Sequence, residues 1–354
     1  MIKLQPHYYR TFIIFFITHL LSGCASINYY AQSIQGQFEV IQKRQNINDL
    51  LMENEISGTL RNKLHTVLEI REFSIKQLGM PENKSYLSYV DLERDYVVWN
   101  IFATEEFSIE PIKWCYLIVG CLDYRGYFAE SDARKHAQNL EVKGLDVYLG
   151  GVSAYSTLGW FNDPVLNTML RWNDIRLATV IFHELAHQQL YIKNDTEFNE
   201  AYAEAIATIG VRKWLSQKSE EQYGDYVDSQ DQEDQFIYLV MKYKSLLSKL
   251  YQSGQTEQSM RTHKKVLFDN MRNEYAVLRQ GWTKDVYAGW FSTELNNAKF
   301  AAVVTYKKYI PAFLEIYEKL NDLDEFYSFV KQLSNCSPAQ RRINLEKRTI
   351  KIEC

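Results

Sequence analysis

The segment IFHELAHQQLYIKNDTEFNE, from Ile181 to Glu200, carries two histidines in the spacing H-E-x-x-H. His183 and His187 are four residues apart, so on a helix both imidazoles lie on one face, a turn apart. Two imidazoles in this arrangement can bind one Zn²⁺ at about 2.0–2.1 Å. Glu184 follows the first histidine and can reach a water on the metal. The spacing therefore predicts a catalytic zinc site with Glu184 as the general base.

A third protein ligand must come from elsewhere, because a catalytic zinc typically takes three and keeps one position open. We expect Glu200 in this role, since the thirteen residues after His187 allow the chain to reverse direction. Glu204 lies one helical turn beyond Glu200 and could hydrogen-bond a ligand histidine. The opposite assignment, with Glu204 on the metal, is the alternative that the spacing leaves open.

Two helices are needed to position these side chains. The first carries the histidines and ends in the polar turn YIKND. The second is the Ala-rich segment EFNEAYAEAIATIGVRKWL, which is expected to run to about Leu215. Asp195 or Thr196 can cap its start with a side-chain oxygen. The pattern predicts an antiparallel helix pair that encloses the metal site.

The rest of the chain predicts an α+β fold that is predominantly helical. Amphipathic helices are expected before residue 80, and a small β region, rich in Tyr, Val, Ile and Trp, at about residues 86–160. This region contains one helix, which ends at Gly144. From about Asn167 onward we expect mostly helix, including a hairpin broken at Gly254 and further helices over residues 300–320 and 324–333. No repeat or linker appears, so residues 24–354 are predicted to form a single domain.

Composition excludes some classes of function. The chain has 354 residues, 46% of them hydrophobic, which suffices for a large core. Its formal net charge is −4 and no long basic run occurs. There is thus no electrostatic signature of nucleic-acid binding. The oligomeric state does not follow from these features.

The N-terminus predicts export and lipidation. A basic start is followed by TFIIFFITHLL, which is too short for the roughly 20 residues that a bilayer span requires. The next residues, Leu21 to Cys24, resemble a bacterial lipobox. We expect residues 1–23 to be a signal peptide and Cys24 to carry a lipid that anchors the protein to the membrane. Ala25 favours the periplasmic face of the outer membrane. The alternative is a plain signal peptide with an incidental cysteine.

The other cysteines agree with an exported protein. An even number in an oxidising compartment suggests disulfides, and four cysteines allow three pairings. Proximity in sequence favours Cys115 with Cys121 and Cys336 with Cys354. A four-thiolate zinc site is the competing interpretation, but the chain lacks any C-x-x-C pair.

The segment HELAHQQLYIKNDTEFNEAYAEAIA resembles an aminopeptidase family of Gram-negative bacteria, most of whose members are predicted lipoproteins. The resemblance extends over nearly all of the mature chain and includes WCYLIVGCLDYRGYF and VYLGGVSAYSTLGWFNDPVLNTML. It implies a zinc-dependent peptidase of the gluzincin type, with a downstream N-E pair, here Asn199 and Glu200. This favours Glu200 over Glu204 as the third ligand. Glu204 itself departs from the family pattern, which more usually has a small or hydroxylated residue there.

Residues and resemblance together predict a zinc metallopeptidase that hydrolyses peptide substrates, and the resemblance makes it an aminopeptidase. Candidate donors to the oxyanion are Tyr155, Tyr191, Tyr202 and Tyr306. Candidate partners for a substrate amine are Glu105, Glu106 and Glu110. The alternative is a non-catalytic envelope lipoprotein that holds a structural zinc or binds another protein, with the acidic stretch at residues 216–235 as its surface.

Overall fold

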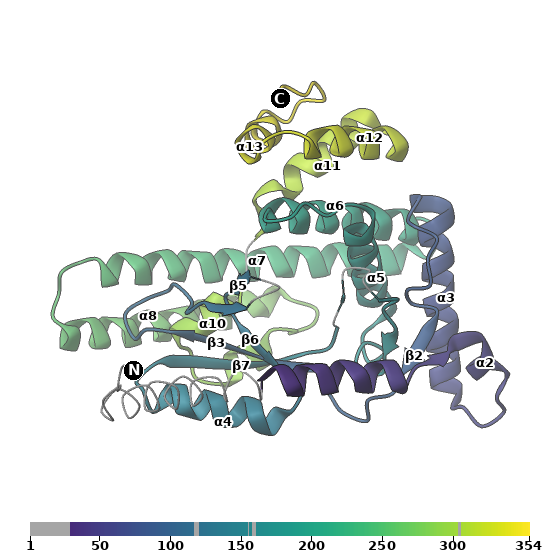
Figure 1. Ribbon diagram of the computed structural model, residues 1–354. Coiled ribbons are helices and arrows are strands. Elements are labelled where there is room, and N and C mark those ends of the chain that lie inside the picture. Colours follow the sequence, from purple (N-terminus) through teal and green to yellow (C-terminus); the bar gives the residue numbers. More distant parts are fainter. Residues whose placement is uncertain (1–28, 117–119, 155, 158–160, 304–305) are drawn as a thin grey trace, which may run out of the picture.

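The computed structural model describes residues 29–354 except 117–119, 155, 158–160 and 304–305 (Figure 1). The predicted signal peptide and the predicted lipidation site Cys24 lie outside the described residues. Among the helices that are described, none is both long and apolar enough to cross a bilayer.

The predicted α+β fold with a predominance of helix is confirmed. The described part of the chain begins with a helix over residues 29–42. The helices that follow are α2 (Ile47–Met52), α3 (Gly58–Leu78), α4 (Glu130–Glu141), α5 (Asp174–Gln189), α6 (Thr196–Leu215), α7 (Glu220–Tyr251), α8 (Glu257–Leu278), η1 (Arg279–Gly281), α9 (Ala288–Ser292), α10 (Asn297–Ala302), η2 (Tyr306–Tyr309), α11 (Ile310–Leu320), α12 (Leu323–Ser334) and α13 (Pro338–Lys347).

The strands form three small sheets within the part of the chain that the structure describes. They are β1 (Gln45–Asn46), β2 (Ser88–Val90), β3 (Val98–Thr104), β4 (Trp114–Tyr116), β5 (Gly120–Leu122), β6 (Arg125–Tyr127), β7 (Asp146–Val152) and β8 (Val165–Leu166). The main sheet has the order β6-β3-β7 and is antiparallel, with Ile101 opposite Leu149. A second sheet has the order β1-β2-β8, and β4 pairs with β5 as a hairpin.

The helices α5 and α6 pack against each other and against α3 in the main hydrophobic core. Gly210 of α6 permits their close approach. A Cβ at this position would lie 2.7 Å from Leu78 of α3 and 2.8 Å from Phe182 of α5. Figure 1 shows α5 crossing beneath α6, with α3 alongside. The pair that carries the predicted site is therefore held rigidly from two sides.

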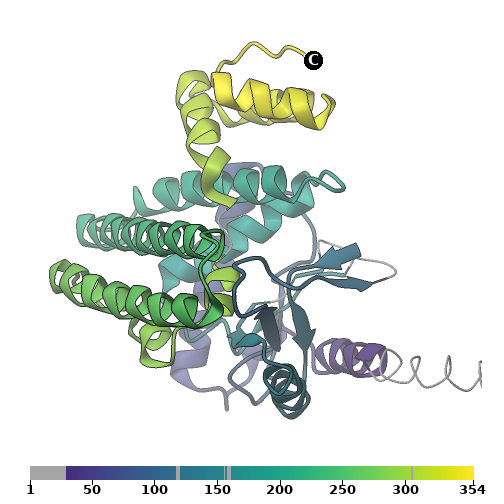
Figure 2. The ribbon, with the colours of Figure 1, turned by 90° about the vertical axis from the view of Figure 1, so that its left-hand side faces the viewer.

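The helical hairpin has the predicted turn but a longer first helix. Gly254 lies in the turn with φ +70°, and α7 and α8 pack along each other (Figure 2). Ser219 caps α7 in a capping box with Gln222, so the helix starts well before the apolar pattern does. The acidic stretch at residues 216–235 is mostly the first half of this helix.

The C-terminal region differs from the sequence prediction in two respects. The single helix expected over residues 300–320 is divided into α10, η2 and α11. Pro311 sits in the first turn of α11, where its missing N–H is tolerated, whereas in a helix interior it would break the hydrogen-bond ladder. Helix α13 was not predicted; a capping box formed by Ser337 and Gln340 starts it.

Both predicted disulfides are present. Cys115 and Cys121 join the β4–β5 hairpin, and Cys336, after α12, binds Cys354 at the end of the chain. The sequence-proximal pairing was therefore the right choice among the three.

Candidate metal centre

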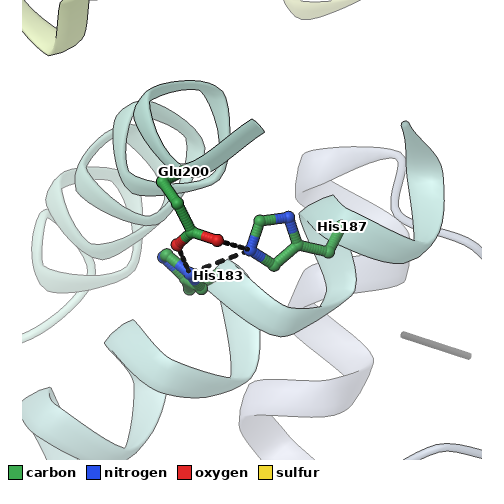
Figure 3. Close-up of side chains that lie close together, drawn as sticks. All are labelled: His183, His187 and Glu200. Atoms are coloured by element: carbon green, nitrogen blue, oxygen red, sulfur yellow. Dashed lines mark hydrogen bonds and ion pairs between the residues drawn. The ribbon is translucent and has the colours of Figure 1, made fainter. Parts of the chain in front are cut away.

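The predicted histidines and Glu200 lie together where α5 and α6 meet (Figure 3). Asn173 caps α5 by accepting a hydrogen bond from the backbone N–H of Arg176. Asp195, one of the two cap residues that the sequence allowed, caps α6 by accepting from the N–H of Phe198. The helices cross, and the contacts of His183 with Glu204 and of His187 with Glu200 show that these turns face the same space.

The donor atoms have the spacing of a first coordination shell. Nε2 of His183 lies 3.1 Å from Nε2 of His187. Glu200 approaches these two nitrogens with its carboxylate oxygens at 3.3 and 3.5 Å. Ligand atoms of a tetrahedral ion with bonds of about 2.0–2.1 Å lie roughly 3.3–3.4 Å apart. The three side chains therefore fit a single small metal ion without rearrangement.

The site is enclosed on one side and open on the other. His187 is buried, whereas the side chains of His183 and Glu200 are 19% and 33% exposed. Glu200 is thus the most exposed of the three donor residues. This is the arrangement expected of a metal that keeps a coordination position for a reactant.

The donor side chains interact with one another through charge. Burial would lower the pKa of His183, but its bonds to Glu200 and Glu204 outweigh burial and raise the pKa. For Glu200, burial would raise the pKa of the carboxyl, and the two histidines lower it below its usual value. Both shifts favour an imidazolium–carboxylate interaction, and a divalent cation that binds these donors would displace the imidazolium proton.

Glu204 lies on the other side of the His183 ring. Nδ1 of His183 is 3.2 Å from a Glu204 oxygen and, in the tautomer that donates there, leaves its Nε2 lone pair directed at Glu200 and His187. Glu200, but not Glu204, belongs to the group of three potential ligands found among the described residues. The geometry matches the first of the two assignments that the spacing allowed.

The turn between the helices is fixed by Asn199, the residue before Glu200. Its fully buried amide accepts from the N–H of Ile192 at 2.8 Å and donates to the carbonyl of the same residue at 2.7 Å. This pair of hydrogen bonds across the turn holds the first turn of α6 against the end of α5. The asparagine of the N-E pair therefore positions the glutamate.

A second buried contact holds the same turn from the C-terminal end of the chain. Arg341 of α13 donates from Nε and Nη2 to one oxygen of Asp195, at 2.8 and 2.6 Å. Both side chains are buried. The other Asp195 oxygen caps α6. Arg341 is thereby connected to the helix that carries Glu200, an interaction that the sequence did not reveal.

Glu184 is half-buried on α5, next to His183. Its negative charge acts on two neighbours: it contributes to the raised pKa of His183, and it adds to burial in raising the pKa of Tyr86 far above the usual range. The pKa of Tyr124 is also raised, mainly by burial and to a smaller extent by the charges of Tyr29 and Glu200. Tyr86 and Tyr124 are thus tyrosines near the site that the sequence analysis missed, since both lie far from the histidine motif and no local pattern marks them.

The tyrosines that the sequence analysis proposed as oxyanion donors differ in burial and in their distance from the site. Tyr202 is buried and its hydroxyl donates to Gln189, so it is a core residue that cannot serve an oxyanion. The ring of Tyr191 lies 6.3 Å from that of His187 and is half exposed. Tyr155 and the side chain of Tyr306 lie outside the described residues.

The acidic residues proposed for the substrate amine form part of a loop between β3 and β4. Glu106 is held by two bonds from Arg261 of α8, at 2.6 and 2.8 Å, so this carboxylate stabilises the fold. Its ion pair lowers its pKa. Glu105 and Glu110 remain on the same loop.

Comparison with protein families gives one match. The model of a family described as "Putative aminopeptidase" matches residues 28–345. The chain belongs to this family. The match covers both helices of the site and the C-terminal helix that contacts them, so Arg341 and the three donor residues all lie within the region shared with the aminopeptidase family. No curated protein and no solved structure matches the chain significantly.

Proposed function

We propose that this protein is a zinc-dependent aminopeptidase, with His183, His187 and Glu200 as the metal ligands. The observation that carries the proposal is the convergence of three donor side chains, with their nitrogen and oxygen atoms 3.1–3.5 Å apart, of which His183 and Glu200 are partly exposed. Two imidazoles and a carboxylate are a donor set that suits zinc in hydrolytic enzymes. Membership of the aminopeptidase family supports a peptide substrate.

Zinc at this position would lower the pKa of a bound water and polarise the scissile carbonyl. Glu184 takes a proton from the attacking water at its carboxylate and passes it to the leaving amine. Glu204 accepts the Nδ1 proton of His183 and so keeps Nε2 available as a ligand. Tyr124 is partly exposed and its pKa is affected by Glu200, so its hydroxyl is the candidate donor to the developing oxyanion, whereas Tyr86 is a core residue like Tyr202.

We also propose that the protein works at the bacterial cell envelope, lipid-anchored through Cys24 at the periplasmic face of the outer membrane. The lipobox-like sequence supports the anchor. The two disulfides support an oxidising compartment.

The first test is the metal content of the exported, purified chain and its activity on aminoacyl reporter substrates. We expect about one zinc per chain. The substitution Glu184→Gln should leave that content unchanged and lower kcat by about 10²–10⁴-fold, because it removes the general base and keeps the ligands. The matched control is Glu197→Gln, on the first turn of α6, which should retain activity.

Two results would contradict the proposal. A chain that retains no zinc after reconstitution would reject the metal site. A zinc-loaded chain without peptidase activity would instead favour the structural-zinc or protein-binding alternative. Blocking the substrate's amino group by acetylation separates the modes of cleavage, since an aminopeptidase loses activity and an endopeptidase does not.

A further inference from the structure

The helix at residues 29–42 has two different faces. Its inner face packs on the body of the protein: Val40 is buried in the main core, and the ring of Phe128 occupies the space where Gly36 lacks a side chain. Tyr29 stacks on Tyr116, with ring centroids 5.3 Å apart. The helix is therefore docked to the protein through a fixed set of residues.

Its outer face carries an apolar stripe in contact with solvent. The stripe consists of Tyr30, Ile34, Phe38 and Ile41, with Ile34 69% and Phe38 55% exposed. At about 100° per residue, these four side chains fall within an arc of roughly 80°. Single exposed apolar residues are ordinary on a protein surface. A continuous row on one helix face indicates instead that the surface binds another molecule or a membrane.

The sequence before the helix indicates what covers the stripe. Cys24, the proposed site of lipidation, is six residues before Tyr30, and an extended chain of that length spans at most about 20 Å. An acylated Cys24 therefore keeps the start of the helix close to the bilayer. The stripe needs no acidic lipid, because Lys43, the nearest cation beyond it, already pairs with Glu39 and Glu93.

We propose that the stripe of Tyr30, Ile34, Phe38 and Ile41 lies in the boundary between headgroups and acyl chains of the phospholipid bilayer. The inference rests on the lipid anchor proposed above. A helix with one apolar face can lie in the plane of the interface, and its buried apolar area adds to the affinity of the acyl chains. Because the helix is packed firmly on the rest of the protein, its binding to the bilayer would fix the orientation of the whole protein relative to the membrane.

The orientation has a consequence for the rest of the molecule. The N-terminal helix runs along one edge, and α11, α12 and α13 lie at the opposite end in both views (Figures 1 and 2). With the stripe on the bilayer, these C-terminal helices point away from the membrane. The metal centre between α5 and α6 is then held at a fixed height above the lipid.

The test uses the full lipidated chain reconstituted in phosphatidylcholine vesicles. All other cysteines are bonded or acylated, so Ile34→Cys introduces one free thiol for an environment-sensitive fluorophore. The matched control is Gln35→Cys, an exposed position about 100° around the same helix. Brominated lipids should quench the label at position 34 at least roughly twofold more than the label at position 35, and 1 M salt should leave this difference unchanged.

Several outcomes are informative. Equal, weak quenching at both positions would overturn the proposal. Energy transfer between copies labelled at position 34 in detergent would overturn it as well, because a second copy would then cover the stripe. The acyl mass on the N-terminal peptide tests the anchor separately. If that mass is absent, quenching of the same two labels on an unlipidated chain with Cys24→Ser, mixed with vesicles, still decides whether the helix binds lipid.

Discussion

The imidazole of His183 performs two tasks with its two nitrogens. Nδ1 faces Glu204 and Nε2 faces Glu200 and His187. A histidine bonded in this way is locked in ring orientation and tautomer, which makes it a better ligand. The two glutamates of α6 therefore differ in role, although they are one turn apart on the same face.

This difference predicts unequal losses of zinc affinity. Replacing Glu204 with Ala should weaken zinc binding about 10–100-fold, because the supporting hydrogen bond is lost while all three ligands remain. Glu200→Ala should weaken it more, since a ligand is removed. Chelator competition measures both, with Glu197→Ala as the control on the same helix. The reverse order of losses would mean that Glu204, not Glu200, binds the metal.

At the scale of elements, the turn between α5 and α6 determines whether the ligands meet. Much of this arrangement follows from the sequence: the helix that carries both histidines and the end of α6 at Leu215 were predicted correctly, and the cap at Asp195 is one of the two residues that the sequence allowed. They could be predicted because each is a local pattern. Tyr86, Tyr124 and Arg341 could not, because distant segments bring them to the site through tertiary packing.

The buried amide of Asn199 provides a test at this scale. Asn199→Ala leaves the N–H and carbonyl of Ile192 without their partner, and should lower the free energy of unfolding by about 1–3 kcal/mol. Urea denaturation of the metal-free protein measures this directly, and zinc affinity should fall together with it. Glu197→Ala, in the same turn of α6, is expected to change stability by less than about 1 kcal/mol. If Asn199→Ala leaves the urea midpoint unchanged, the hydrogen bonds between Asn199 and Ile192 do not contribute to stability.

At the scale of the whole molecule, the helical hairpin and the main sheet meet around α10. Its Lys299 is buried, and the ammonium donates to the carbonyl of Trp290 at 2.6 Å and to the hydroxyl of Thr293. Burial, with a smaller contribution from Arg272, lowers the pKa of Lys299 to about 8. Between pH 8 and the ordinary lysine value of about 10.4, the unfolded chain holds a proton that the folded chain has released.

Stability should therefore respond to pH at this residue in a defined direction. Because the unfolded state binds more protons, the contribution of Lys299 to stability rises as pH increases from about 8 to 10.4. The stability of the wild type relative to Lys299→Met should thus improve between pH 7.5 and 10 in urea titrations. Lys213→Met, at an exposed position of α6, serves as the control. A relative stability that falls over this range would contradict the depressed pKa.

The contact between Arg341 and Asp195 joins residues 146 positions apart in the chain. The histidine motif and Glu200 leave the ribosome well before Arg341 does, so a nascent or prematurely ended chain has both proposed ligand helices but not the bond from α13 to the cap of α6. If the proposed metal site is correct, the complete chain should therefore hold the ion more tightly than a chain that ends before α13.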